Sequence, residues 1–365
     1  MKKLIFLGVI LSFNLCTYAQ KDSTSVKGTA VDQSTIESLG LVNPKIAKLY
    51  NEGVKALNSK KNEEAIQKFT EVILMDPNHS KAIYNRGTAF KNLKKYNEAV
   101  NDFIKTTELD PENGLAFYMQ GMSQFEAQKY DLAVSVLRKA YTVDVTLEKA
   151  AYYEGVSYFK MESYDEAISA FDKAISIKSD YAYAYNDRGS CKLKKDNIED
   201  AIKDYKFAVN IDKKLSFAYN NLASAYRKKE DFTSAIKYYS EAIKYKQDYY
   251  VAYNNRGMAK FEKGDFTGAM FDFNKSISIN SEYAYAFNNK ASVYIKLGQN
   301  NEAINACNKA LSFYPEYMEA FFNRGIAKEM IKDLKGACAD WEDAFILGSE
   351  NAEKYINSPA CAKSK

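Results

Sequence analysis

The same residue type returns at a fixed interval over most of this chain. From Ala65, every 34th residue up to Ala337 is alanine, which places nine alanines in one register. A glycine or alanine lies twelve residues before each of them, and a larger side chain, aromatic in most cases, lies four residues after. No insertion or deletion interrupts the register between residues 46 and 351. This period indicates an array of short structural repeats rather than the two or three globular domains that 365 residues could hold.

Each repeat contains two helical patterns. In the second half of the first repeat, apolar residues from Ala65 to Ile73 recur with the spacing of one helix face. A polar turn at residues 60–62 separates the two helices, and a proline at Pro77 ends the second one. The small residues let the paired helices approach closely, and the larger side chain fills the space beside them. Because one hairpin cannot bury its apolar stripe alone, the hairpins must stack into an all-α array.

The period, the small residues Gly53 and Ala65, the aromatic Phe69 and the Asp76-Pro77 ending together resemble the tetratricopeptide repeat family. The resemblance covers residues 46–351 and implies a right-handed superhelical solenoid whose first helices line the concave side. We therefore expect nine repeats over residues 45–351. A capping helix and tail over residues 352–365 should then cover the apolar end of the last repeat.

The N-terminus has the pattern of a secretory signal peptide over residues 1–19. Lys2 and Lys3 precede an apolar stretch, and Thr17-Tyr18-Ala19 forms a small-x-small cleavage site. The apolar stretch is shorter than the ~20 residues that span a bilayer, so we expect no integral membrane segment once the signal is removed. Residues 20–44 are rich in Ser, Thr, Asp and Lys and are predicted to be a flexible linker. The expected location is the periplasm or the extracellular space.

Charge and composition disfavour several functional classes. The formal charge of +4 is too near neutral for a nucleic-acid binder with a concentrated basic face. The single histidine excludes a multi-histidine metal site, and the chain has no glycine-rich phosphate loop or nucleophile motif. We therefore expect no catalytic activity, no cofactor and no metal ion.

Four repeats carry an arginine that is matched by an aspartate sixteen residues later. The pairs are Arg86 with Asp102, Arg188 with Asp204, Arg256 with Asp272, and Arg324 with Asp340. In the first repeat the signs are reversed, with Glu52 and Lys68 at these positions. This compensation predicts contact across each hairpin. Anion binding by the arginines is the alternative, but each arginine has an internal carboxylate available.

Four cysteines remain after removal of the leader. Cys191 and Cys307 lie at core positions and are expected to be buried thiols. Cys338 and Cys361 flank the cap, and an oxidising compartment would permit a disulfide between them. Closing this loop would stabilise the fold by about 3 kcal/mol in the chain-entropy model.

The first helices carry three columns of residues that suggest a peptide-binding groove. We number each repeat from residue 46, so that position five is tyrosine in the first four repeats and asparagine in the next four. The candidate groove residues are Tyr84, Tyr118, Tyr152, Asn186, Asn220, Asn254 and Asn288 at position five, Tyr183, Phe217 and Tyr285 at position two, and Asn221, Asn255 and Asn289 at position six.

Asparagine suits peptide recognition because its amide can pair with a backbone N–H and a backbone C=O together. Packed helices lie roughly 8–10 Å apart and an extended chain advances ~3.3 Å per residue. One asparagine per repeat would thus meet about every third ligand residue. Polar residues on an exposed concave face need no ligand to explain them. Ligand contact and plain solvation both stay open, and both place the position-five side chains in solvent.

These observations favour an exported scaffold that binds a protein or an extended peptide. One alternative is a regulatory or targeting arm of an envelope enzyme. Another is a glycan or cell-wall binder, because a chain with 29 tyrosines could stack sugars. The identity of the partner and the oligomeric state stay open.

Overall fold

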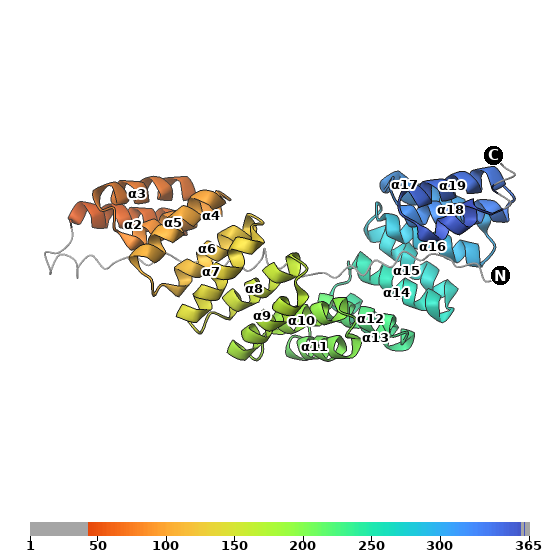
Figure 1. Cartoon of the computed structure of the whole chain (residues 1–365), viewed down its shortest axis with the longest axis horizontal. Coiled ribbons are helices and arrows are strands. Elements are labelled where there is room, and N and C mark those ends of the chain that lie inside the picture. Colours follow the sequence, from red (N-terminus) through yellow and green to blue (C-terminus); the bar gives the residue numbers. More distant parts are fainter. Residues whose placement is uncertain (1–42, 359–360, 362–365) are drawn as a thin grey trace. The chain divides into compact units, whose positions relative to one another are not determined.

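The computed structural model describes residues 43–358 and Cys361. This part of the chain forms α-helices and contains no strand (Figure 1). The helices group into two compact units, and each unit is a stack of antiparallel hairpins in which every helix packs against the next. The N-terminal unit contains α2 (Pro44–Asn58), α3 (Asn62–Met75), α4 (Ser80–Asn92), α5 (Tyr96–Leu109), α6 (Gly114–Glu126), α7 (Tyr130–Val143), α8 (Glu148–Lys160), α9 (Tyr164–Ile177), α10 (Ala182–Lys194) and α11 (Ile198–Ile211). The C-terminal unit contains α12 (Ser216–Lys228), α13 (Phe232–Tyr245), α14 (Tyr250–Lys263), α15 (Phe266–Ile279), α16 (Ala284–Lys296), α17 (Asn300–Phe313), α18 (Met318–Met330), α19 (Leu334–Ile346) and α20 (Glu350–Ile356).

The predicted all-α repeat solenoid is confirmed, and its hairpins keep the 34-residue register. Each even-numbered helix from α2 to α18 is the first helix of a repeat, and the helix that follows it is the second. The right-handed path of the array stays a prediction. The predicted signal peptide of residues 1–19 and all but the last two residues of the predicted linker lie outside the described residues.

The turn inside each hairpin needs one residue in the left-handed region of the backbone. That residue is position fifteen of every repeat, for example Lys60 with φ 60° and Gly264 with φ 92°. Only two of the nine repeats place glycine there. Most repeats therefore accept the small strain of a side chain at positive φ, and the turns keep their shape without a fixed sequence.

The small positions hold the two helices of each hairpin in close contact. A Cβ atom added to Gly53 would lie 2.7 Å from Cε1 of Phe69, and one added to Gly257 would lie 2.7 Å from Cε1 of Phe273. Both distances are too short for real carbon atoms, so the glycine and the aromatic ring require each other. The predicted pairing of small and large positions is therefore present.

The C-terminal end of the stack is covered by α20, which begins two residues before the predicted cap. The ring of Tyr355 lies 4.6 Å from that of Trp341 and 5.3 Å from that of Phe322. Cys338 and Cys361 form a disulfide with their Cα atoms 5.6 Å apart. The cap thus closes the apolar end of the last hairpin.

The described helices carry no bilayer-spanning segment, since none of them combines sufficient length with sufficient apolar character. Within residues 43–358 and Cys361, no group of three or more His, Cys, Asp or Glu side chains is arranged to hold a metal ion.

Candidate functional site

The position-five asparagines of the C-terminal unit form a buried hydrogen-bonded ladder. Each accepts a hydrogen bond from the position-six asparagine of the next repeat, 35 residues further along the chain. The three rungs join Asn255 Nδ2 to Asn220 Oδ1 at 3.2 Å, Asn289 Nδ2 to Asn254 Oδ1 at 2.9 Å, and Asn323 Nδ2 to Asn288 Oδ1 at 2.9 Å. None of these six side chains is more than 4% exposed. The ladder therefore connects successive first helices within the stack.

The same two positions are paired in the N-terminal unit with other chemistry. Asn85 Nδ2 donates to the hydroxyl of Tyr50 at 3.0 Å. Tyr152 donates its hydroxyl to Asp187 Oδ2 at 2.6 Å. A hydrogen bond from position five to the next position six thus joins repeats in both units.

The second repeat lacks this hydrogen bond because the position-six partner of its tyrosine is a methionine, and the third repeat pairs two aromatic rings. The partner position for Tyr84 is Met119, and the buried hydroxyl of Tyr84 has no hydrogen-bond partner. Burial raises the pKa of Tyr84 to about 12. The partner position for Tyr118 is Tyr153, and these two rings lie 6.4 Å apart.

The expectation that the position-five asparagines point into solvent is wrong. Adjacent first helices approach so closely that positions five and six face each other, and an amide at either position is buried. Asn186 is buried too and donates to Asp187 Oδ1 at 2.8 Å. The position-six residues Asn221, Asn255 and Asn289 are likewise buried.

The aromatic candidates divide into buried and partly exposed residues. Tyr118, Tyr152 and Phe217 are buried, whereas Tyr84, Tyr183 and Tyr285 are half-buried and reach the surface. At position two, Tyr183 and Tyr285 therefore remain available to a partner and Phe217 does not, whereas among the position-five candidates only Tyr84 reaches the surface.

Asp187 is the one carboxylate at position six of the described repeats, and it is completely buried. Burial raises its pKa from 3.8 to about 6, and the hydrogen bonds from Tyr152 and Asn186 act in the opposite direction. This is the position at which most later repeats carry asparagine.

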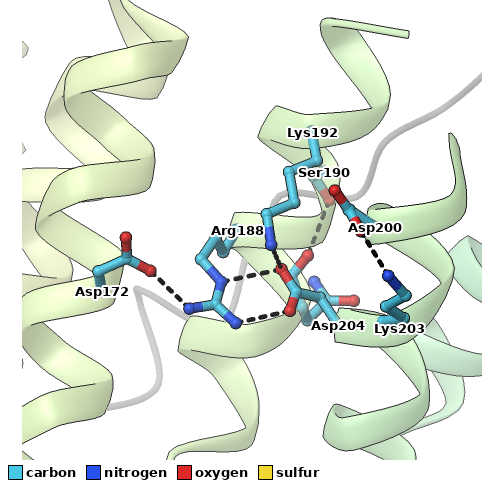
Figure 2. Close-up of polar contacts among 8 residues, drawn as sticks. Asp172, Arg188, Ser190, Lys192, Asp200, Lys203 and Asp204 are labelled. Atoms are coloured by element: carbon cyan, nitrogen blue, oxygen red, sulfur yellow. Dashed lines mark hydrogen bonds and ion pairs between the residues drawn. The ribbon is translucent and has the colours of Figure 1, made fainter. Parts of the chain in front are cut away.

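The predicted arginine–aspartate pairs are present and they extend across repeats. Arg188 on α10 donates to both carboxylate oxygens of Asp204 on α11 at 2.8 and 2.6 Å, and to Asp172 on α9 at 2.5 Å (Figure 2). Lys192 lies 2.7 Å from the same Asp204. The guanidinium thus joins its own hairpin to the preceding one.

The equivalent arginines make the same two kinds of contact. Arg86, Arg256 and Arg324 each bind their own aspartate through two nitrogens and reach a polar side chain of the preceding second helix, namely Thr70, Ser240 and Asn308. Because the chain itself occupies these donors, the structural role is favoured over anion binding.

The fourth repeat reverses the polarity of this network, which the sequence reasoning missed. Its position-seven residue is Glu154, fully buried, which accepts hydrogen bonds from Arg138 at 2.9 and 2.7 Å and from Tyr141 at 2.7 Å. The signal was present, because Arg138 lies sixteen residues before Glu154 as Asp172 lies before Arg188. A shallow cavity of about 470 Å³ opens beside this pair, lined also by Ala170 and Lys173.

A cluster of tyrosines surrounds the one position-two candidate of the eighth repeat. The ring of Tyr285 lies 5.0 Å from that of Tyr317, 5.4 Å from Tyr283 and 6.3 Å from Tyr314. Tyr314 and Tyr317 stack at 5.5 Å with 17° between their planes. The sequence reasoning identified Tyr285 alone, because the other three belong to the connections between repeats and not to the first-helix columns.

This arrangement defines a helical-hairpin repeat protein with charged and amide networks inside and selected aromatic side chains at the surface. Models of the tetratricopeptide repeat family match residues 84–151, 216–249, 250–283 and 284–317, and a related TPR repeat model matches residues 155–196. The chain belongs to the tetratricopeptide repeat family.

Several solved structures are similar to this chain. The Cut9 and Hcn1 hetero-tetramer of the APC/C matches with a TM-score of 0.53 and 16% identity, over 80% of this chain and 58% of that one, which reflects a shared fold. MamA from Desulfovibrio magneticus RS-1 matches with a TM-score of 0.45 and 24% identity, over 47% of this chain and 98% of that one. YrrB, described as a TPR protein with an unusual peptide-binding site, matches with a TM-score of 0.43 and 20% identity, over 50% of this chain and 95% of that one. No curated protein matches the chain.

Proposed function

We propose that this protein is an exported scaffold that binds an extended segment of a partner protein or peptide along the position-two face of its first helices. Stacked repeat arrays typically bind other molecules on the extended surface that their repeated helices create. The proposal keeps the predicted class of partner and, of the predicted binding columns, keeps position two and drops positions five and six.

The observation that carries the proposal is the difference in exposure between neighbouring columns of the same helices. Positions five and nine are almost entirely buried. Position two is partly or fully exposed in most repeats, with Lys81, Leu115, Lys149, Tyr183, Val251, Tyr285 and Glu319. A varied row of side chains above a hydrogen-bonded floor is suited to recognise a sequence at low entropic cost, because the floor is already ordered.

Export is supported by the signal pattern of residues 1–19 and by the paired cysteines at the C-terminal cap. A disulfide persists in an oxidising compartment and is rare in a reducing one. Fractionation of cells that express the full chain tests this part directly. Recovery of the protein in the cytoplasm with residues 1–19 still attached would contradict it.

The binding face is tested by incorporating a photo-crosslinking amino acid in place of Tyr183 or Tyr285 in the full chain. We expect both variants to crosslink to the same partner. A matched variant carries the crosslinker at Glu302, an exposed residue on the second helix α17, and should not capture that partner. Capture from Glu302 but not from Tyr183 or Tyr285 would show that another face binds.

A further inference from the structure

The tyrosine cluster around Tyr285 differs from equivalent places in the same array. In the fourth and sixth repeats, a lysine at position 31 covers the tyrosine at position 34. The amines of Lys178 and Lys246 lie 5.6 and 5.1 Å from the ring centroids of Tyr181 and Tyr249. The array thus contains its own examples of a cation bound to a tyrosine ring at these positions.

In the eighth repeat the lysine is absent. Position 31 is Tyr314, which is 41% exposed and stacks on the position-34 ring of Tyr317. In the described part of the chain, no Lys or Arg lies over the rings of Tyr283, Tyr285, Tyr314 or Tyr317. The rings are therefore gathered without the cation that accompanies them elsewhere.

A carboxylate completes the cluster. Glu319 is the position-two residue of α18, lies two residues after Tyr317 in the sequence and is half-buried. Burial raises its pKa, and no cationic side chain lowers it again. The pKa of Tyr317 is raised by burial first and next by the charge of Glu319, so the carboxylate lies close to the rings. Unlike the buried acids Glu154 and Asp102, Glu319 has no salt-bridge partner among the described residues.

We infer that Tyr285, Tyr314 and Glu319 form a site for one basic side chain, arginine or lysine, of the bound segment, while the buried ring of Tyr317 supports Tyr285 and Tyr314. The ring faces attract a cation through their quadrupoles, and the carboxylate supplies the opposite charge. A guanidinium fits best, because its plane can stack on a tyrosine ring while its N–H groups reach the carboxylate. The inference rests on the proposed function and specifies what the partner must carry near the C-terminal end of the array.

The test uses the full chain and two acetylated, amidated peptides, Gly-Ser-Arg-Ser-Gly and the same peptide with neutral citrulline in place of arginine. Citrulline keeps the shape of arginine and removes its charge. In ligand-observed NMR titrations, we expect the arginine peptide to bind roughly three- to tenfold more tightly than the citrulline peptide. Equal affinity for the two peptides would overturn the inference and assign the cluster to apolar or aromatic ligands.

Two variants locate the binding. Glu319→Gln should weaken the arginine peptide roughly three- to tenfold and leave the citrulline peptide unchanged. Tyr314→Leu keeps an apolar side chain at an exposed position and should weaken the arginine peptide in the same way. Glu302→Gln removes an exposed acid elsewhere and should change neither affinity. An unaltered arginine affinity in Glu319→Gln would refute the site.

The failure of this inference can be told apart from failure of the proposed function. Crosslinking from Tyr183 reports partner binding to the N-terminal unit, whereas the cluster belongs to the C-terminal unit. If the partner is still captured there with full affinity when Glu319→Gln is introduced, the basic-residue site is wrong and the scaffold function stands. If the crosslinker at Tyr183 captures no partner even when Glu319 is unchanged, the proposed function itself is wrong.

Discussion

Replacing Asn254 by alanine tests whether the amide ladder stabilises the stack. The change removes the acceptor for Asn289 Nδ2, which lies 2.9 Å away and is buried. A buried donor that loses its partner costs about 1–3 kcal/mol. We therefore expect Asn254→Ala to lower the free energy of unfolding by about 1–3 kcal/mol, measured by urea denaturation followed by circular dichroism. A solvent-facing asparagine would change stability by no more than about 0.5 kcal/mol.

The double-mutant cycle with Asn289→Ala isolates the contact. If Asn254 and Asn289 interact, the loss in the double variant should fall short of the sum of the single losses by about 0.5–3 kcal/mol. The exposed Asn301 on α17 supplies the control, since Asn301→Ala should be nearly neutral. Additive losses in the cycle would refute the reasoning, because they would show that the two amides do not share a hydrogen bond.

Three further predictions follow from particular contacts. Tyr84→Phe should be neutral or stabilising in thermal unfolding, because it removes a buried hydroxyl without a partner. The matched variant Tyr50→Phe should lower the free energy of unfolding by about 1–2 kcal/mol, because it leaves the Asn85 amide without its acceptor. The pKa of Asp187 is about 6 in the folded protein against an ordinary 3.8, so its contribution to stability is full below about pH 4 and is lost as the pH rises to about 6. Asp187→Asn should abolish this pH dependence and stabilise the protein at pH 7 by about 3 kcal/mol or less, as measured by unfolding at a series of pH values. Non-reducing peptide mapping by mass spectrometry should recover Cys338 joined to Cys361 with Cys191 and Cys307 free, and four free thiols would contradict it.

The fold could be predicted in detail because the residues that determine a repeat lie close together in the sequence and recur in nine repeats. Gly53 and Phe69 are sixteen residues apart and belong to one hairpin, so their mutual fit is visible as a fixed spacing in the sequence. The arginine–aspartate pairs were found in the same way, by compensation at a constant separation. The third contact of Arg188, with Asp172 in the preceding hairpin, also spans sixteen residues, but it joins two repeats and therefore falls outside a comparison of positions within one hairpin.

The burial of the ladder could not be predicted from the residue types alone. Tyrosine and asparagine are common on exposed faces, and a column of either one is compatible with a solvated groove. What decides is the distance between neighbouring first helices, which depends on how the hairpins stack. A signal did exist at a separation of 35 residues, since Tyr50 precedes Asn85, Tyr152 precedes Asp187 and Asn254 precedes Asn289.

The ladder changes what the tyrosine-to-asparagine transition along the array means. At position five the transition replaces the hydrogen bonds of Tyr50 and Tyr152 with an amide and an acid by hydrogen bonds between two amides in the later repeats. The transition therefore alters how neighbouring repeats contact each other. Because these asparagines are buried, they can affect ligand binding only by shifting the first helices.

Selectivity for a partner must then come from positions that the stack leaves exposed. Position two varies from Lys81 to Tyr183 to Glu319 while its neighbours at position five are held by their rungs. A substitution at position two can change recognition and leave the ladder hydrogen bonds in place, because none of them involves a position-two side chain. A substitution at position five weakens the array first. Binding variants are therefore to be made at Tyr183, Tyr285 and Glu319 with stability measured alongside, because both tyrosines also pack against core residues. Loss of binding in an Asn254 variant counts as evidence for a groove only if its stability is unchanged.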